Sequence, residues 1–238
     1  MGMKASHRFL LGGGLIMVLL LVVWLSCTGV IGGGAILTGE EALAKRAEIL
    51  EIAESFVNHE WTASEANVLH GEDARGVRVD TPDVSFNNNG WHADGRVNVG
   101  LPYEWGGFSS LEEFDRGIEA GKYAGNIPKG RSAGASGYCV GLDCSGYVSR
   151  CWGLRTKRST RSIGRLCNEL ESFDDLLPGD IANRHDGHVV IFKEFVDDEH
   201  TKMRVYEAAI PKVKESMYDV ARMKEQGYVP MRYKRLGG

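Results

Sequence analysis

The chain has 238 residues, of which 43% are hydrophobic and 25% are charged. That length allows one domain of roughly 150 to 200 residues plus an attachment, and the composition is that of a globular protein, which excludes collagen-like, coiled-coil and disordered chains. Residues 1–38 contain two basic residues and no acidic one, so the remainder carries 26 basic and 32 acidic residues. An acidic domain lacks the positive surface that nucleic-acid binding needs, so we expect no nucleic-acid partner.

Residues 9–37 form a run of 29 residues without a charge. A membrane-spanning helix needs about 20 apolar residues, whereas a cleaved signal peptide has a shorter apolar core and an Ala-x-Ala-like exit. We therefore predict a transmembrane anchor at residues 9–37. Because Lys4 and Arg8 precede the run, residues 1–8 are predicted as a cytoplasmic tail and the remainder as the extracytoplasmic part of a single-pass membrane protein.

Two other interpretations of the N-terminus stay open. Leu25-Ser-Cys27 resembles the end of a bacterial lipoprotein signal, which would leave a lipid-anchored or secreted protein after cleavage. Met1-Gly2 with Ser6 fits the N-myristoylation pattern, although a spanning helix would make that anchor redundant.

A helix with one apolar face is predicted directly after this run. Thr38-Gly-Glu-Glu41 has the form of a capping box. Apolar residues then recur at helical spacing at Leu43, Ala47, Leu50, Ala53 and Val57, with Ile49, Ile52 and Phe56 beside them. The following residues are turn-rich and show no period. Residues 38–96 are thus predicted to be an amphipathic helix and a segment that wraps around the domain or links to it.

Residues 97–238 are predicted to fold as one domain of short elements. Two helices are expected, at residues 109–120 and 143–152, the second with Asp143 as its N-cap. Leu177-Pro-Gly-Asp180 is typical of a turn. Strands are expected after this turn, at residues 181–183, 188–195, 202–209 and 228–235. Helices followed by an antiparallel sheet predict an α+β fold.

A cysteine and a histidine in this domain have the positions that nucleophilic catalysis needs. Cysteine attacks as the thiolate, which the free N–H groups and the dipole at a helix N-terminus stabilise, and Cys144 lies there. His188 begins the apolar run His-Val-Val-Ile-Phe, which is typical of a buried strand, so we predict it as the base. His185 is the alternative base, but Asp186-Gly187 is predicted as a hairpin turn that leaves His185 on the far side.

A third residue should orient the imidazole. If residues 195–202 connect two strands, His188 faces Ala209 across the hairpin. Glu207 then points to the same face as His188 and lies diagonally beside it. We predict Glu207 as the orienting residue, although a register slip of one residue would turn it to the opposite face.

Five motifs occur in order along the chain: Tyr103-Glu-Trp-Gly-Gly107, Leu142-Asp-Cys-Ser-Gly-Tyr-Val148, Ser159-Thr160, Leu177-Pro-Gly-Asp180 and Gly187-His-Val-Val-Ile191. In this order they resemble the motifs of the NlpC-type cell-wall cysteine peptidases. The resemblance implies a papain-like domain over residues 97–238, with a helix-borne cysteine packed on an antiparallel sheet, preceded here by the N-terminal transmembrane helix.

The same resemblance implies roles for single residues. Cys144 would be the nucleophile and His188 the base, with the third residue on the next strand, where this chain has Glu207. Tyr103 would line the cleft near the thiolate, and Asp143 and Ser145 would help to hold the amino end of the substrate. Two features depart from the family: the position of Glu207 is often histidine, and residues 108–142 insert 35 residues between two motifs that a short loop usually joins.

These observations predict a membrane-anchored cysteine hydrolase that cleaves amide bonds in peptidoglycan peptides through a thioester acyl-enzyme. The alternatives are an amidase or acyltransferase of the same fold acting on another amide or ester, and a non-catalytic module that binds the cell wall. We expect no cofactor and no metal, because Cys139, Cys151 and Cys167 form no Cys-x-x-Cys unit. They are interpreted as structural thiols, two of which could pair in an oxidising compartment. The sequence indicates no oligomeric state.

Overall fold

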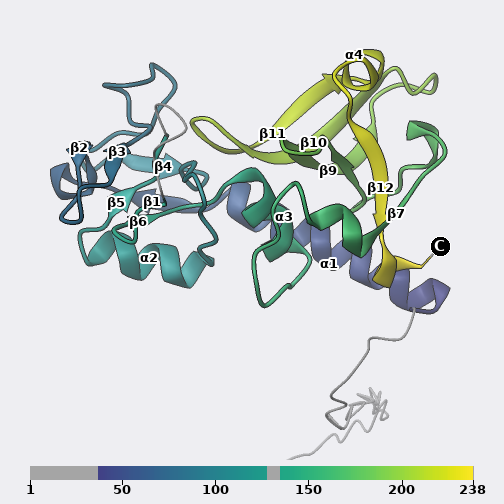
Figure 1. The fold of residues 1–238 in the computed structure, drawn as a ribbon, viewed down its shortest axis with the longest axis horizontal. Helices are drawn as coiled ribbons and strands as arrows, with labels where there is room; N and C mark the ends of the chain where they lie inside the picture. The colour runs from purple at the N-terminus through teal and green to yellow at the C-terminus, as the bar shows by residue number, and fades with distance from the viewer. Residues whose placement is uncertain (1–36, 128–134, 238) are drawn as a thin grey trace, which may run out of the picture. The chain divides into compact units, whose positions relative to one another are not determined.

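A computed structural model of the chain describes residues 37–127 and 135–237. These residues form an α+β domain built around a six-stranded antiparallel sheet (Figure 1). The helices in this part of the chain are α1 (Gly39–Val57), α2 (Leu111–Glu119), α3 (Cys144–Cys151) and α4 (Val220–Glu225). The smaller strands that precede α3 are β1 (Glu60–Thr62), β2 (His70–Glu72), β3 (Arg78–Asp80), β4 (Val97–Val99), β5 (Tyr123–Ala124) and β6 (Cys139–Val140).

The six-stranded sheet has the strand order β11-β10-β9-β8-β12-β7. Its strands are β7 (Cys167–Glu169), β8 (Ile181–Asn183), β9 (Val189–Phe195), β10 (Lys202–Ala209), β11 (Lys212–Asp219) and β12 (Val229–Tyr233). The run Val189-Val-Ile-Phe192 is buried along its whole length, because β9 lies inside the sheet with β8 and β10 as neighbours. The β8–β10 hairpins therefore form the rigid centre of the domain.

Helix α1 buries the predicted apolar face at Ile49, Ala53 and Phe56 but departs from it in its first half. Thr38 forms the expected capping box, its backbone N–H donating to Glu41 Oε2 at 2.9 Å. The buried residues of the helix are Arg46, Ile49, Ala53 and Phe56, whereas Leu43 is 68% exposed. The face is rotated because Arg46 is drawn inward to Asp180, so one charged residue belongs to the buried stripe.

Two sets of contacts attach α1 to the rest of the domain. The Tyr147 hydroxyl of α3 donates to the carbonyl of Ala53 at 2.8 Å, and the two helices lie side by side (Figure 1). Arg46 Nη1 lies 2.8 Å from Asp180 Oδ1, and Arg232 Nη2 of β12 lies 3.0 Å from the other carboxylate oxygen. Asp180 ends the Leu177–Asp180 turn, so this buried triad joins α1, the turn and β12.

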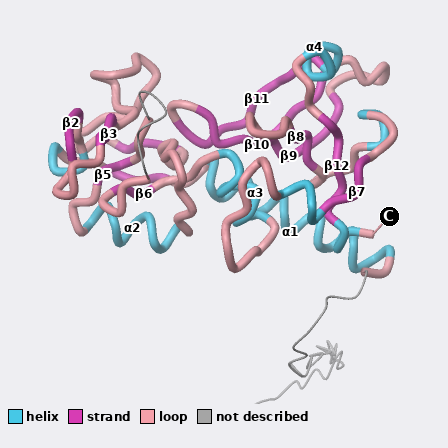
Figure 2. Tube along the Cα trace, viewed as in Figure 1, coloured by secondary structure: helices cyan, strands magenta, loops and turns pink. Residues whose placement is uncertain are grey.

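The part of the chain before α3 is built differently, from strand pairs two or three residues long that are separated by loops (Figure 2). Its apolar centre is an aromatic cluster in which Trp61 contacts both Trp91 and Phe114, with ring centroids 5.5 and 5.1 Å apart. Trp91 also donates to the carbonyl of Ala124 at 3.0 Å. The predicted wrapping segment is thus attached to α2 and β5, which belong to the 108–142 insertion.

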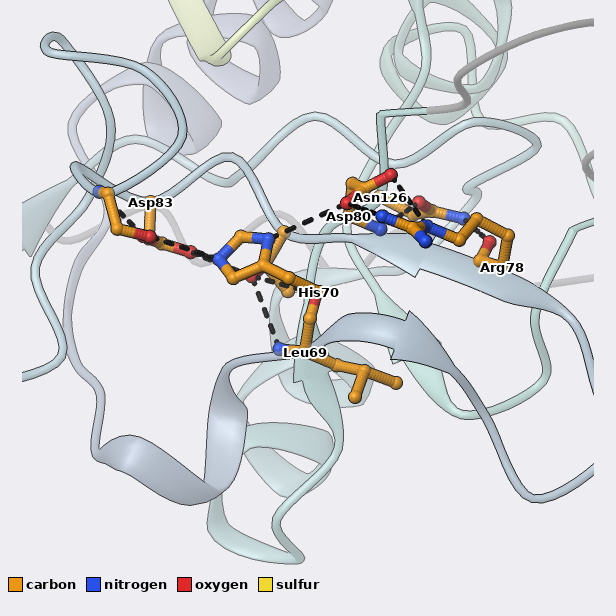
Figure 3. A network of polar contacts seen from close by, with 8 residues as sticks. Leu69, His70, Arg78, Asp80, Asp83 and Asn126 are labelled. Atoms are coloured by element: carbon orange, nitrogen blue, oxygen red, sulfur yellow. Dashed lines mark hydrogen bonds and ion pairs between the residues drawn. The ribbon is translucent and has the colours of Figure 1, made fainter.

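A polar network on β2 and β3 strengthens this attachment (Figure 3). The His70 imidazole lies between two buried carboxylates, with Nε2 2.9 Å from Asp83 Oδ2 and Nδ1 3.7 Å from Asp80 Oδ1. Arg78 also reaches Asp80 through a two-pronged ion pair, and the backbone N–H of Asp80 donates to Asn126 Oδ1 at 2.9 Å. These bonds link the wrapping segment to the insertion where the strands are too short to do so.

The predicted fold class, a papain-like domain preceded by one transmembrane helix, needs correction. The described residues support an α+β domain with a six-stranded antiparallel sheet. None of the helices in residues 37–127 and 135–237 has both the length and the apolar character that crossing a bilayer requires. Helix α1 has 19 residues but carries acidic side chains along its length and two basic residues, Lys45 and Arg46. The predicted tail at residues 1–8 and the anchor at 9–37, except Leu37, lie outside the described residues.

Candidate active site

Cys144 is the first residue of α3, and the preceding Asp143 caps the helix by accepting a hydrogen bond from the backbone N–H of Gly146 at 2.7 Å. The helix start is pressed against the Tyr103–Gly107 turn. A Cβ atom at Gly146 would lie 2.0 Å from the carbonyl oxygen of Gly107, so a glycine is required there. The glycines of two separate motifs therefore serve one purpose, which is to let the turn approach the helix N-terminus.

His188 directly precedes β9 and follows the tight turn that joins β8 to β9. In the β9–β10 hairpin Ile191 pairs with Tyr206. This is the register that the predicted pairing of His188 with Ala209 requires. A bulge between Arg204 and Val205 shifts the register by one residue near the loop. The bulge lies beyond the site, so Glu207 does share a face with His188, and its Oε2 lies 2.7 Å from His188 Nε2.

Glu207 is held by a strand that the sequence did not predict. The β11 hydroxyls of Ser216 and Tyr218 donate to its two carboxylate oxygens at 2.5 and 3.0 Å. Because β11 is an edge strand with Val213 as its one well-buried apolar residue, it lacks the apolar alternation by which strands are recognised. The sequence signal for this strand is the occurrence of polar side chains at every second residue, Lys214, Ser216 and Tyr218, which places them on one face.

The electrostatics of the site favour a charged imidazole. Burial lowers the pKa of His188, but its hydrogen bonds to Cys144 and Glu207 and the negative charges of both outweigh burial and raise the pKa to about 9. Burial raises the pKa of Glu207, yet hydrogen bonds from His188 and Ser216 lower it below its ordinary value. At neutral pH the site thus contains a protonated imidazole between a sulfur atom and an ionised carboxylate.

A cavity of about 700 Å³ opens beside Cys144 and His188. It is bounded by the immediate neighbours of both residues, Asp143 and Ser145 on one side and Gly187 on the other. Its remaining walls come from the turn before α3 and the loop after it: Trp105, Gly106, Lys157, Ser159, Thr160, Arg161 and Asp186. The residues on either side of Cys144 thus line a cavity large enough for a small peptide, whereas Cys144 and His188 are not themselves among its lining residues.

The three predicted substrate-binding residues all lie next to Cys144. Tyr103 is 9% exposed, and burial raises its pKa, as do the nearby charges of Cys144 and Asp143. Asp143 accepts hydrogen bonds from Gly106 and from Ser145, whose hydroxyl is 3.1 Å away, and it contacts the Lys157 ammonium. Their proximity is shown, whereas their roles toward a substrate stay predictions.

The 108–142 insertion leaves this cleft open as far as its described residues show. They line a second cavity of about 640 Å³, on the other side of Gly106, together with Glu104 and Arg150. Burial raises the pKa of Glu104 to about 8, and the negative charge of Asp143 adds to the effect. Glu104 is therefore largely protonated at neutral pH.

Three other cysteines lie in the described part of the chain. Cys139, Cys151 and Cys167 are buried, and all are free thiols, so none of the pairings considered from the sequence is formed. Burial raises the pKa of Cys139 and Cys167 to about 12, and it also raises that of Cys151 well above its ordinary value. No group of three or more His, Cys, Asp or Glu side chains in residues 37–127 and 135–237 could hold a metal ion. His185, the alternative base, is exposed at the hairpin turn.

Compared with models of known protein families, with curated proteins and with solved structures, the chain has no match. The papain-like fold implied by the motif resemblance is accordingly unsupported, and the α+β description above replaces it. The site's geometry, rather than any relative, has to carry the functional argument.

Proposed function

We propose that this protein is a cysteine hydrolase that cleaves amide bonds through Cys144. The observation that carries the proposal is the position of His188 between Cys144 and Glu207: the neighbouring Cys144 side chain helps to raise the pKa of His188, and His188 Nε2 lies 2.7 Å from Glu207 Oε2. A nucleophile, a base and an orienting acid in contact are the arrangement that activates a thiol. With Nε2 directed at Glu207, Nδ1 is the nitrogen that serves the sulfur.

The proposed reaction has two halves. The Cys144 sulfur attacks the amide carbonyl carbon, and the protonated His188 gives its proton to the nitrogen as the carbon–nitrogen bond breaks. This releases the amine and leaves a thioester on Cys144. Neutral His188 then takes a proton from water as its oxygen attacks the thioester, and the carboxylic acid leaves as the sulfur–carbon bond breaks.

The negative oxygen that forms in each half needs donors. The first N–H groups of a helix have no acceptor within the helix, and Cys144 contributes the first of them in α3. We assign the Cys144 N–H to the oxyanion. Glu207 stays ionised throughout, since two hydroxyls of β11 donate to it, and it keeps the imidazole oriented.

The substrate class in this proposal is a peptidoglycan peptide. Its support is the order of the five motifs, whose residues meet in the fold: the Tyr103–Gly107 turn touches the start of α3, and Leu177–Asp180 leads into β8, whose hairpin carries His188. Anchoring to a membrane through residues 9–37 remains a prediction from the sequence, as does an extracytoplasmic location.

The experiment compares Cys144→Ala with Cys139→Ala, two cysteines of similar exposure at 8% and 6%. The full-length proteins are incubated with muropeptides, and the products are identified by mass spectrometry. We expect stem-peptide cleavage by the unaltered protein and by Cys139→Ala, and none by Cys144→Ala. Cleavage that persists in Cys144→Ala would contradict the proposal.

The products also separate the two alternative functions. An amidase or acyltransferase with another substrate would leave the stem peptides intact while Cys144 still reacts rapidly with an electrophile. A wall-binding module would bind the muropeptides, and its Cys144 would react no faster than Cys139.

A further inference from the structure

A lysine that the sequence did not single out lies beside the candidate nucleophile. Lys157 follows α3, lines the cavity of about 700 Å³ and contacts the carboxylate of Asp143, the residue before Cys144. It is therefore the basic side chain in contact with the start of α3. Arg161 lines the same cavity but is held by Asp186 through a two-pronged ion pair of 2.7 and 2.6 Å.

The carboxylate of Asp143 is already occupied by the protein. It accepts from the N–H of Gly146 at 2.7 Å, the N–H of Gly106 at 3.1 Å and the hydroxyl of Ser145 at 3.1 Å, besides contacting Lys157. A carboxylate has about four acceptor sites, so these donors account for its capacity. A substrate amine would have to displace one of them.

Lys157 is more accessible than the acid it contacts. Its side chain is 25% exposed, against 10% for Asp143. An ammonium group has three donors, so contact with Asp143 leaves it able to bind a second carboxylate. Two backbone N–H groups already stabilise the negative charge of Asp143 by donating to it. The carboxylate therefore does not depend on Lys157 alone.

We propose that Lys157 makes the cleft selective for substrates that carry a carboxylate next to the scissile amide. This inference rests on the proposed function, since it names the substrate class of the same site. It differs from the expectation that Asp143 and Ser145 hold an amino end, because here the recognised group is an anion and the recognising group is the lysine.

The test uses two alkylating reagents of nearly equal size, iodoacetate, which is an anion, and iodoacetamide, which is neutral. The rates at which each modifies Cys144 in the full-length protein are measured by peptide mass spectrometry. The ratio of the two rates reports charge selectivity and cancels changes in the reactivity of the sulfur. We expect Lys157→Gln to lower the iodoacetate-to-iodoacetamide ratio roughly threefold or more, and Lys157→Arg to preserve it.

Lys193→Gln is the matched control. Lys193 is 28% exposed and pairs with a carboxylate, Glu215, at 2.7 Å, but it does not line the cleft. Its ratio should equal that of the unaltered protein. An equal fall in Lys193→Gln and Lys157→Gln would show a general charge effect and overturn the proposal.

A double variant separates binding by Lys157 from repulsion by an uncovered Asp143. Asp143→Asn with Lys157→Gln removes both charges, and asparagine still caps a helix. A low ratio in the double variant supports the proposal, whereas recovery of the original ratio overturns it. If Cys144 of the unaltered protein reacts with iodoacetamide no faster than Cys139, the proposed function itself fails, whatever the ratio.

Discussion

His188 and Glu207 lie at or within strands of seven and eight residues, whereas the turn that covers Cys144 belongs to a region whose strands have two or three residues. In the sheet, backbone pairing determines where the side chains point. In the region before α3, hydrogen bonds between side chains and the backbone hold the segments in place. Examples are the Asn126 side chain with the backbone of Asp80 and the Trp91 side chain with the backbone of Ala124. The comparison indicates that the proposed catalytic residues and the proposed substrate cleft are held by two kinds of scaffold, one regular and one assembled from loops.

The largest effect is expected where the sheet supplies the chemistry. Glu207→Gln keeps the shape of the side chain but removes the charge that stabilises protonated His188, so kcat/KM should fall by roughly two to four orders of magnitude. Because the pKa of His188 is raised to about 9, partly by Glu207, the high-pH decline in kcat/KM should begin at a lower pH in the variant. Muropeptide hydrolysis measured across the pH range tests both expectations.

Glu215→Gln is the control for this experiment. Glu215 lies on the same sheet and pairs with Lys193, but it points away from the site. Its rate and pH profile should match those of the unaltered protein. Full activity in Glu207→Gln would mean that the sheet does not supply the orienting acid.

The next effect compares the stability of the two scaffolds. Asp180 is fully buried between the buried Arg46 and the partly buried Arg232, so Asp180→Asn leaves both cations without their partner and should cost about 3–5 kcal/mol. Asp80 is also buried, but its partners Arg78 and His70 are 49% and 32% exposed, so water can replace the lost contacts. Asp80→Asn should therefore cost only about 1–3 kcal/mol in urea unfolding. Equal losses would contradict the distinction between the two scaffolds.

A third expectation concerns the pH dependence of stability. Folding raises the pKa of His188 from 6.5 to about 9, so the folded state binds the proton more tightly than the unfolded state. The resulting stabilisation is complete below about pH 6.5 and is lost as the pH rises through 9. It amounts to at most about 3.5 kcal/mol, since a shift of one pKa unit corresponds to about 1.4 kcal/mol.

Urea unfolding at a series of pH values measures this effect, and Glu207→Gln supplies the comparison. The variant should lose less stability between neutral and alkaline pH, because the charge that holds the proton on His188 is gone. An identical pH dependence in the two proteins would show that Glu207 does not raise the pKa of His188.

The smallest effect is expected in the loop-built wall of the cleft. Trp105 is 48% exposed and lines the cavity, so Trp105→Ala should change stability by no more than about 0.5 kcal/mol. Loss of its contact with substrate should raise KM roughly two- to tenfold. Tyr138→Ala is the control, since Tyr138 is 38% exposed in the same region and does not line this cavity. An unchanged KM in Trp105→Ala would remove this residue from the substrate site.

The sequence predicted those elements correctly whose structure depends on residues close together in the chain. Asp143 marked the start of α3, and Leu177–Asp180 does form a turn. The two-residue period of a hairpin placed Glu207 beside His188, because the bulge between Arg204 and Val205 lies on the loop side of the site. One further bulge closer to the site would have turned Glu207 away.

The same patterns were misleading where a distant partner determined the outcome. The apolar residues of α1 placed Leu43 in the buried face, but the face contains Arg46 instead, because Asp180 lies opposite it. Strand β11 was missed because one of its faces carries polar residues that serve Glu207 rather than an apolar core.

Local spacing along the chain thus established the helix that begins at Cys144 and the hairpin that joins His188 to Glu207, since both depend on residues close in sequence. The meeting of Cys144 with His188, the ion pair of Lys157 with Asp143 and the burial of Arg46 arise only in the folded chain. Such contacts join segments with no common period, and they form because burying apolar surface brings those segments together and leaves their polar groups to find partners there.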